Sequence, residues 1–269
     1  MSSFPIVMTS TTASSTSCPS PAEPASAAAP ALIDAGTASC LPAPTAVIAC
    51  GALGSAIREI AARRGWHLEV HALPPLLHNR PRAIAPSAEK LASQLLSEGR
   101  TVVLAYADCG SYGALDDMCA RLSLRRLRGL HCYDVYAGAE RIRALFEEDA
   151  GTYVLTDFLV RSFRRTVLSE LGLDHRPELW GDFFGNYKRV VWLAQRRNAA
   201  LESEAKKVAG MFRLPLTILD VGVGGLESEL EQLLVEASSP SNLAVATESK
   251  VRPAGPGAGG DGGRSCAAD

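Results

Sequence analysis

The feature that most constrains the fold is a repeated alternation of short apolar blocks with amphipathic segments of helical period. Val47-Ile48-Ala49, Val102-Val103-Leu104 and Ile218-Leu219 are continuous apolar blocks. Such blocks are typical of strands that are buried on both faces, as in a parallel sheet with helices on each side. The alternation therefore predicts an α/β fold, with an open, doubly wound, mostly parallel sheet and helices on both faces.

The expected elements follow from the same pattern. Strands are predicted at 45–51, 67–73, 101–107, 127–132, 152–158 and 214–222. Helices are predicted at 53–64, 87–98, 114–122, 137–149, 159–171, 183–197, 199–212 and 226–235. Because no strand separates 183–197 from 199–212, we expect these two helices to pair and to cover one edge of the sheet.

The two ends of the chain differ in composition from its middle. Residues 1–44 are mainly Ser, Ala, Thr and Pro and contain no Lys or Arg, and residues 237–269 are rich in Gly, Pro and Ser. Neither segment can bury enough apolar area to offset the entropy of ordering, so both are predicted to be disordered. A single α/β domain is then expected at 45–236, within the usual size range of one domain.

Charge and hydropathy exclude several classes of protein. The chain has 27 basic and 29 acidic residues and a formal net charge of −2, which gives no reason to expect nucleic-acid or anionic-membrane binding. No apolar stretch approaches the roughly 20 residues that span a bilayer. The N-terminus lacks a basic segment followed by an apolar one, so a cytoplasmic protein is expected rather than a secreted one. Its Ser/Ala content with few acids is also compatible with a plastid transit peptide.

Cysteines follow three of the predicted strands. The first strand ends in Cys50, the third in Asp108-Cys109 and the fourth in His131-Cys132. Ligands of an open parallel sheet bind outside the carboxyl ends of its strands, and in the common strand order 2-1-3-4-5 these three strands are neighbours. We therefore expect Cys50, Cys109 and Cys132 to lie together at one edge of the sheet.

Three thiols in a crevice match the ligand preference of zinc or another thiophilic divalent metal, with a fourth position left for water, His131 or a substrate. A metal-bound substrate thiol would be activated because the metal lowers its pKa. The proton-transfer candidates are Asp108, His131 and Asp157. The residues expected to line the ligand are Gly51, Gly110 and Tyr133, with Arg161 holding an anion near a helix N-terminus.

Two other interpretations of the cysteines stay open. Cysteine is a small, readily buried residue, so all three thiols could simply be packed in the core. The protein would then be an accessory protein or one that binds an anionic small molecule in the crevice. Alternatively, Cys109 paired with His131 could be a catalytic nucleophile. Cys119 lies in the helical segment "LDDMCARL", whose spacing turns it toward the core, and we interpret it as packing.

Several segments together resemble a known family. "VIACGAL", "LLHNRP", "YADCG", "GLHCYDVYAG", "YVLTDFLVRSF" and "GNYKRVVWLAQ", with their ACG, YxDCG, HCYD and LTDFL motifs, are similar to an uncharacterised prokaryotic family known only as a domain of unknown function. The likeness covers about residues 45–235. It implies a shared site at Cys50, Cys109 and Cys132, although the position of His131 is not always histidine there. Some members occur beside corrinoid-dependent methyl-transfer genes, which implies a link to one-carbon chemistry and a methyl-transfer partner protein.

Overall fold

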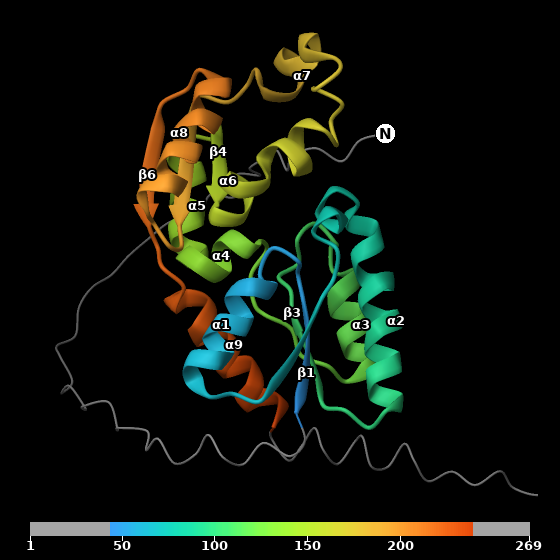
Figure 1. Cartoon of the computed structure of the whole chain (residues 1–269). Helices are drawn as coiled ribbons and strands as arrows, with labels where there is room; N and C mark the ends of the chain where they lie inside the picture. Colours follow the sequence, from blue (N-terminus) through green and yellow to red (C-terminus); the bar gives the residue numbers. More distant parts are fainter. Residues whose placement is uncertain (1–43, 239–269) are drawn as a thin grey trace, which may run out of the picture.

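The computed structural model describes residues 44–238, which form two parallel three-stranded sheets with helices packed around them (Figure 1). The first sheet has the order β2-β1-β3, from β1 (Thr45–Ala49), β2 (Leu68–Ala72) and β3 (Val102–Ala105). The second has the order β4-β5-β6, from β4 (Thr152–Thr156), β5 (Arg189–Ala194) and β6 (Leu216–Asp220). The predicted α/β class with parallel strands is confirmed, and the strands are divided between two sheets. The predicted tails lie outside the described residues.

The first sheet is built on β1, whose five residues are all buried. Its register pairs Val47 with Val70 on one side and with Val103 on the other. Helices α1 (Gly54–Arg64), α2 (Ile84–Ser97), α3 (Ala114–Leu122) and α9 (Gly224–Ala237) cover it, with α1 and α9 on one face and α2 and α3 on the other (Figure 1). A strand covered on both faces must be apolar throughout, which is why β1 reads as an uninterrupted apolar run.

The second sheet buries both faces of its central strand β5. Val190, Trp192 and Ala194 belong to one hydrophobic cluster, and Val191 and Leu193 belong to another. This alternation is the two-residue period of a strand. The first cluster includes residues of α6 (Asp157–Phe163) and α8 (Ala199–Phe212), and the second includes residues of α5 (Ala139–Glu148).

The two sheets lie end to end, with α4 (Cys132–Ala137) between them (Figure 1). After β6 the chain returns to the first sheet as α9, which packs on α4 and β3. A Cβ at Gly225 would lie 2.6 Å from the backbone oxygen of Tyr136, so only glycine permits this approach of α9 to α4. The two halves are also joined by an ion pair between Arg196 and Glu59 at 2.6 Å. The ends of the strands therefore meet around α4.

Two predicted elements are wrong. The segment 127–132 is not a strand: only Arg126 forms a parallel bridge, with Leu104 of β3, and the chain then turns at Gly129 (φ +102°) into α4. The segment 183–197 is not a helix, because it holds the end of α7 (Trp180–Phe184) followed by β5. The helix predicted at 159–171 is shorter, as α6 passes into a π-helical turn at Arg164–Leu168.

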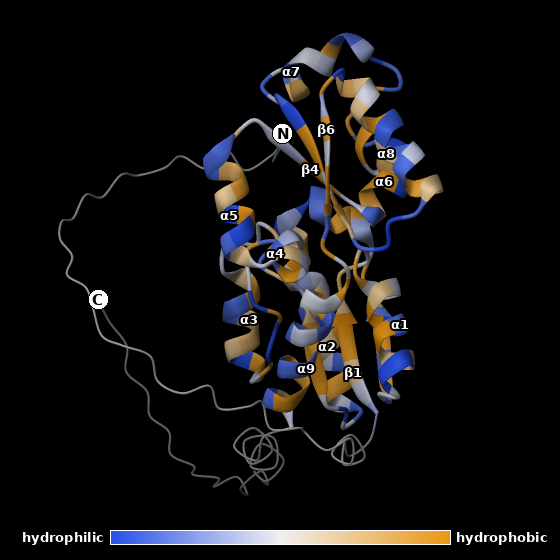
Figure 2. Ribbon diagram, turned by 90° about the vertical axis from the view of Figure 1, so that its left-hand side faces the viewer, coloured by the Kyte–Doolittle hydropathy of each residue, from blue (hydrophilic) through white to orange (hydrophobic). Residues whose placement is uncertain are grey.

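Hydropathy follows this architecture (Figure 2). Hydrophobic colour is concentrated on the strands and on the helix faces turned toward them, and the outer faces of the helices are hydrophilic. Within residues 44–238, no helix is both long enough and apolar enough to cross a membrane.

Candidate functional site

Cys50, Cys109 and Cys132 stand on three neighbouring segments that backbone hydrogen bonds join. Cys50 follows β1, and its N–H donates to the carbonyl of Ala105 at the end of β3 (3.1 Å). In the loop after β3, the N–H of Cys109 donates to the carbonyl of Leu130 (2.8 Å). Leu130 precedes Cys132, the first residue of α4, by two positions. The sheet, the loop and the short helix thus bring the three cysteines together where the two sheets meet.

All three thiols are free and lie in or against the hydrophobic core of the first sheet. Cys50 and Cys109 are buried, and Cys132 is half-buried. Burial raises the pKa of Cys50, and it outweighs the opposing effect of the backbone of Ala52, the side chain of Tyr106 and the backbone of Leu53 near the thiol. Burial and the nearby Cys50 raise the pKa of Cys109 to about 12, and burial together with Cys109 and Cys50 raises the pKa of Cys132. The three thiols are therefore close enough to influence one another, and each is neutral near pH 7.

This electrostatic environment bears on the nucleophile interpretation. A catalytic thiol needs a depressed pKa, because the thiolate is the nucleophile. Cys109 has the opposite shift, and burial also lowers the pKa of His131, which disfavours the imidazolium that would stabilise a thiolate. These pKa shifts thus give no support to a Cys109–His131 nucleophile pair.

The thiols do not form a ready site for a single ion. Among the residues that the structure describes, no set of three His, Cys, Asp or Glu side chains is arranged as the ligands of one metal ion. Three thiolates on one zinc would have their sulfurs within about 4 Å of each other, because each zinc–sulfur bond is about 2.3 Å. The three cysteines are neighbours without having this arrangement.

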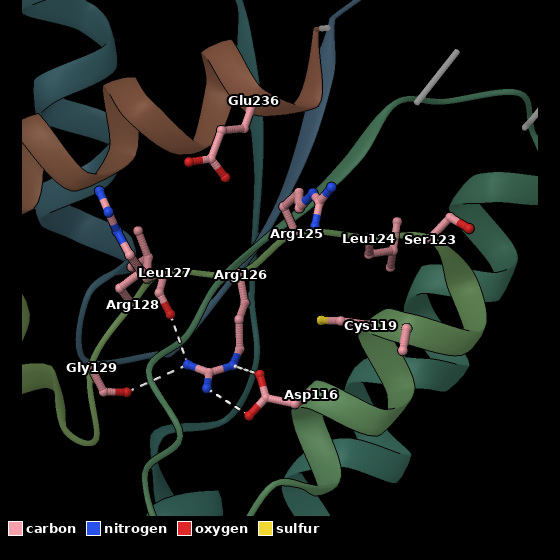
Figure 3. A pocket seen from close by; sticks show the side chains of 11 residues that line it. Asp116, Cys119, Ser123, Leu124, Arg125, Arg126, Leu127, Arg128, Gly129 and Glu236 are labelled. Carbon is pink, nitrogen blue, oxygen red and sulfur yellow. Dashed lines mark hydrogen bonds and ion pairs between the residues drawn. The ribbon is translucent and has the colours of Figure 1, made fainter. Parts of the chain in front are cut away.

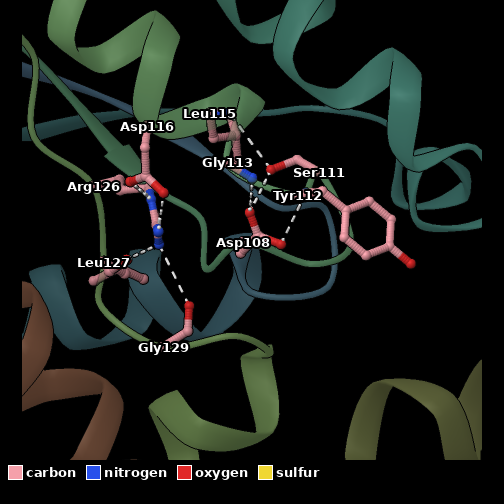
Figure 4. A network of polar contacts seen from close by, with 9 residues as sticks. All are labelled: Asp108, Ser111, Tyr112, Gly113, Leu115, Asp116, Arg126, Leu127 and Gly129. Carbon is pink, nitrogen blue, oxygen red and sulfur yellow. Dashed lines mark hydrogen bonds and ion pairs between the residues drawn. The ribbon is translucent and has the colours of Figure 1, made fainter. Parts of the chain in front are cut away.

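Asp108 holds the loop that carries Cys109 (Figure 4). Its Oδ1 accepts hydrogen bonds from the Ser111 hydroxyl (2.7 Å) and the Gly113 N–H (3.0 Å), and its Oδ2 accepts one from the Tyr112 N–H (3.1 Å). Burial raises the pKa of Asp108, but these hydrogen bonds outweigh it, so the net shift is downward. The carboxylate is an ionised anchor of the turn before α3, and its predicted part in proton transfer stays a prediction.

A second anchor fixes the segment that leads to Cys132. Arg126 forms a bidentate ion pair with Asp116 of α3, with bonds of 2.6 and 2.8 Å (Figure 4). The same guanidinium donates to the carbonyl of Leu127 (2.8 Å), and the carbonyl of Gly129 accepts a bond from the N–H of Asp108 (3.1 Å). Through these contacts, the backbone on both sides of Cys109 is held to α3.

A hollow of about 590 Å³ lies beside this network, on residues 123–129, Glu236 and part of α3 (Figure 3). Cys119 points into it, but Cys50, Cys109 and Cys132 do not line it. It is an open surface hollow rimmed by Arg125, Arg126 and Arg128, and its chemistry is separate from that of the three thiols.

His131 and Tyr133 flank Cys132 at the start of α4. Asp134 accepts hydrogen bonds from the N–H of Leu130 (2.7 Å) and of His131 (3.1 Å), and its carboxylate lies 3.9 Å from the His131 imidazole. The rings of His131 and Tyr133 stack, with centroids 6.0 Å apart. These contacts orient α4 and keep Cys132 at its first position.

Asp157 and Arg161 belong to the second half of the molecule. The buried Asp157 carboxylate accepts bonds from the indole N–H of Trp192 (3.0 Å) and from the N–H groups of Gln195 (3.1 Å) and Arg196 (2.9 Å). These bonds fasten the first turn of α6 to the end of β5. Arg161 is exposed in the last turn of α6, so it is not at the helix N-terminus where an anion would bind.

The two predicted ligand-lining glycines, Gly51 and Gly110, are both required by the backbone structure. A Cβ at Gly51 would lie 2.5 Å from the backbone oxygen of Leu73 and 2.8 Å from Pro75. Gly110 adopts φ +81°, a conformation that L side chains rarely adopt, and packs beside Pro81. Gly51 thus lets the segment after β2 approach the residue that follows Cys50, and Gly110 provides the turn that follows Cys109.

Replacing Gly51 with alanine is expected to destabilise the fold by about 1–3 kcal/mol, because the new methyl group collides with backbone that cannot move away. The matched control is Gly181→Ala in α7, where no atom lies within 4 Å of the added Cβ. That change should be neutral or stabilise by up to about 1 kcal/mol, since alanine is the better helix former. Urea denaturation of both variants checks this. Equal stabilities would contradict the close approach at Gly51.

Residues that the strand-end pattern did not single out also belong to the site. Tyr106 is buried and hydrogen bonds to the Cys50 thiol. Tyr106 stands two residues before Asp108 in "YADCG". The motif that drew attention to Cys109 therefore also contained Tyr106, and this closeness in sequence could have identified it as a site residue. Tyr136 of α4 is in electrostatic range of Cys132, Asp157 and Cys50. His78 lies in the 3₁₀ helix Pro75–Asn79 after β2, and burial together with the charge of His131 lowers its pKa.

Comparison with known proteins places the chain in a family without assigning a reaction. No curated protein and no solved structure matches it. One family model matches residues 72–230, a range that holds Cys109 and Cys132 and begins after Cys50. Because this match covers more than half of the chain, the protein belongs to the family described as "Protein of unknown function (DUF1638)".

Proposed function

We propose that the protein binds a thiophilic metal centre through Cys50, Cys109 and Cys132. The observation that carries the proposal is their proximity: three cysteines with free thiols, from segments far apart in sequence, stand on neighbouring hydrogen-bonded backbone at the junction of the two sheets. Three cysteine ligands leave one coordination position without a protein ligand, which is the arrangement that metal-dependent catalysis uses. A substrate thiol or a methyl-transfer partner protein would then meet the metal at that position.

The state of the thiols is compatible with metal loading. Burial and mutual proximity raise their pKa values, so three thiolates together are costly in the empty protein. A bound cation removes this cost and releases the protons, because the metal takes the place of the repelling negative charges. Asp108, His131 and Asp157 remain the proposed proton-transfer groups, and Gly51, Gly110 and Tyr133 the proposed ligand-lining residues. Arg161 is no longer among them, because it lies in the last turn of α6.

A second candidate has its own support. Cys50 and Cys109 are 6 % and 5 % exposed within the hydrophobic core, and residues 44–238 offer no ready set of ligands for one ion. Both facts favour the interpretation that the thiols only fill space in the core. The protein would then bind a small anionic molecule or act as an accessory factor.

Metal content separates the two candidates. We expect about one metal centre per chain in untagged protein purified without oxygen, and its loss in Cys109→Ser. The matched control is Cys119→Ser, because Cys119 is equally buried but lies outside the three-thiol set; it should keep the metal. Circular dichroism and urea denaturation establish that each variant is folded. Equal, substoichiometric metal in all three proteins would leave the thiols as packing residues.

A further inference from the structure

We infer that the centre held by Cys50, Cys109 and Cys132 is an iron–sulfur cluster with one iron free of protein thiolate, and not a single zinc ion. This inference rests on the proposed function and names the class of metal centre. The cysteine ligands of a zinc ion all bind the same atom. The cysteine ligands of an iron–sulfur cluster bind different irons and stand further apart, and the inference follows from this difference.

The first step concerns how firmly each cysteine is placed. The N–H of Cys50 is bonded to β3, and the N–H of Cys109 is bonded to the segment before α4. Cys109 itself adopts a left-handed backbone conformation (φ +49°), which is uncommon for a non-glycine residue. Asp108 and Arg126 fix the two segments on either side. The fold therefore fixes the backbone positions of the three cysteines. Only rotation of their side chains can change the distances between the sulfur atoms.

The second step concerns what that separation fits. A single zinc needs three or four donors on one point, and neither three cysteines nor a mixed set with His, Asp or Glu meets that requirement within the described part of the chain. In an iron–sulfur cluster, each cysteine binds a different iron, so the thiolates surround the cluster and stand further apart than on one ion. Three neighbouring thiols that do not converge on a point fit the second geometry.

The third step concerns the surroundings of the sulfurs. Backbone groups of Ala52 and Leu53 lower the pKa of the Cys50 thiol, and the backbone of Cys132 lowers that of Cys109, so polar backbone surrounds both sulfurs. Hydrogen bonds to cysteine sulfur and shielding from solvent are the protein's means of setting the potential of a cluster. Cys50 and Cys109 are buried and Cys132 is half-buried, so Cys132 is the most exposed residue of the three.

Anaerobic reconstitution of the full chain with ferric and ferrous iron and sulfide tests the inference. We expect about four irons and four labile sulfides per chain, a visible thiolate-to-iron absorption and a paramagnetic signal after reduction with dithionite. Cys132→Ala, at the half-buried position and thus the least costly for folding, should lose most of the iron and sulfide. Cys119→Ala should retain them.

The outcomes separate this inference from the proposed function. Stoichiometric zinc that depends on Cys109 and Cys132, with no cluster after reconstitution, would overturn the cluster and leave the metal site in place. The absence of any cysteine-dependent metal would overturn both. Equal iron uptake by wild type and by a folded Cys50→Ala/Cys109→Ala/Cys132→Ala variant would identify the iron as adventitious and would also overturn the cluster.

Discussion

Replacing Trp192 with alanine is expected to cost about 3–5 kcal/mol of unfolding free energy, the range for removing a large buried aromatic side chain. Trp192 is fully buried at the centre of β5, and its ring belongs to the hydrophobic cluster under α6 and α8. The substitution leaves a cavity in that cluster and removes the indole N–H that donates to Asp157. Urea denaturation with linear extrapolation measures the loss.

Trp192→Phe is the matched control because it keeps an aromatic ring and removes the N–H. It should cost clearly less than Trp192→Ala, and most of its cost should come from the lost hydrogen bond and a smaller cavity. A Trp192→Ala variant as stable as the wild type would mean that β5 is not the buried centre of the second sheet.

The same strand shows where sequence reasoning failed. Val190 to Ala194 form a continuous apolar run, which is typical of a strand buried on both faces but equally of a buried helix segment. The amphipathic character of the longer stretch favours a helix, which is what the sequence predicts for 183–197. The β-branched Val190 and Val191 were the contrary signal, since β-branched residues favour strands. Periodicity alone cannot decide such a short run.

The segment 127–132 failed for the opposite reason. Its apolar residues suggested a strand, but Leu130 is 57 % exposed and Gly129 turns the chain away from the sheet. What remains of a fourth strand is the single bridge from Arg126 to Leu104, beside β3. Cys132 therefore reaches the other cysteines as the first residue of a helix. That this segment lies next to β3 was predictable. That it forms a turn and a helix there depends on the conformation of Gly129 and on Asp134, which accepts hydrogen bonds at the start of α4.

The site was predictable where it depended on topology and not where it depended on particular hydrogen bonds. Strands β1 and β3 are neighbours in a parallel sheet, so residues after them meet, as the common strand order 2-1-3-4-5 predicts. The division of the strands between two sheets does not follow from the alternation of elements, because each half of the chain carries the same β-α rhythm. Partners such as Ser111 for Asp108 are set by the local turn, so a strand-end carboxylate could not be told from a loop anchor in advance.

Replacing Asp157 with alanine is expected to cost about 3–5 kcal/mol, because three donors lose their acceptor at once. The indole N–H of Trp192 and the N–H groups of Gln195 and Arg196 converge on this carboxylate, which is 5 % exposed. Each buried donor left without a partner costs about 1–3 kcal/mol. The control Asp182→Ala removes an exposed carboxylate from α7 and should change stability by less than about 0.5 kcal/mol.

The Asp157 variants also distinguish a positioning role from a part in the chemistry. Asp157→Asn keeps one acceptor oxygen but turns an amide N–H toward a backbone donor, so it should cost less than alanine and more than Asp182→Ala. Because Asp157 and Trp192 are in contact, the cost of Asp157→Ala measured in a Trp192→Phe background should be smaller than in the wild type. If these bonds only hold α6 to β5, a folded Asp157→Asn protein keeps its full cysteine-dependent metal content. Loss of metal in a folded Asp157→Asn protein would instead tie this carboxylate to the thiol site across the junction of the two sheets.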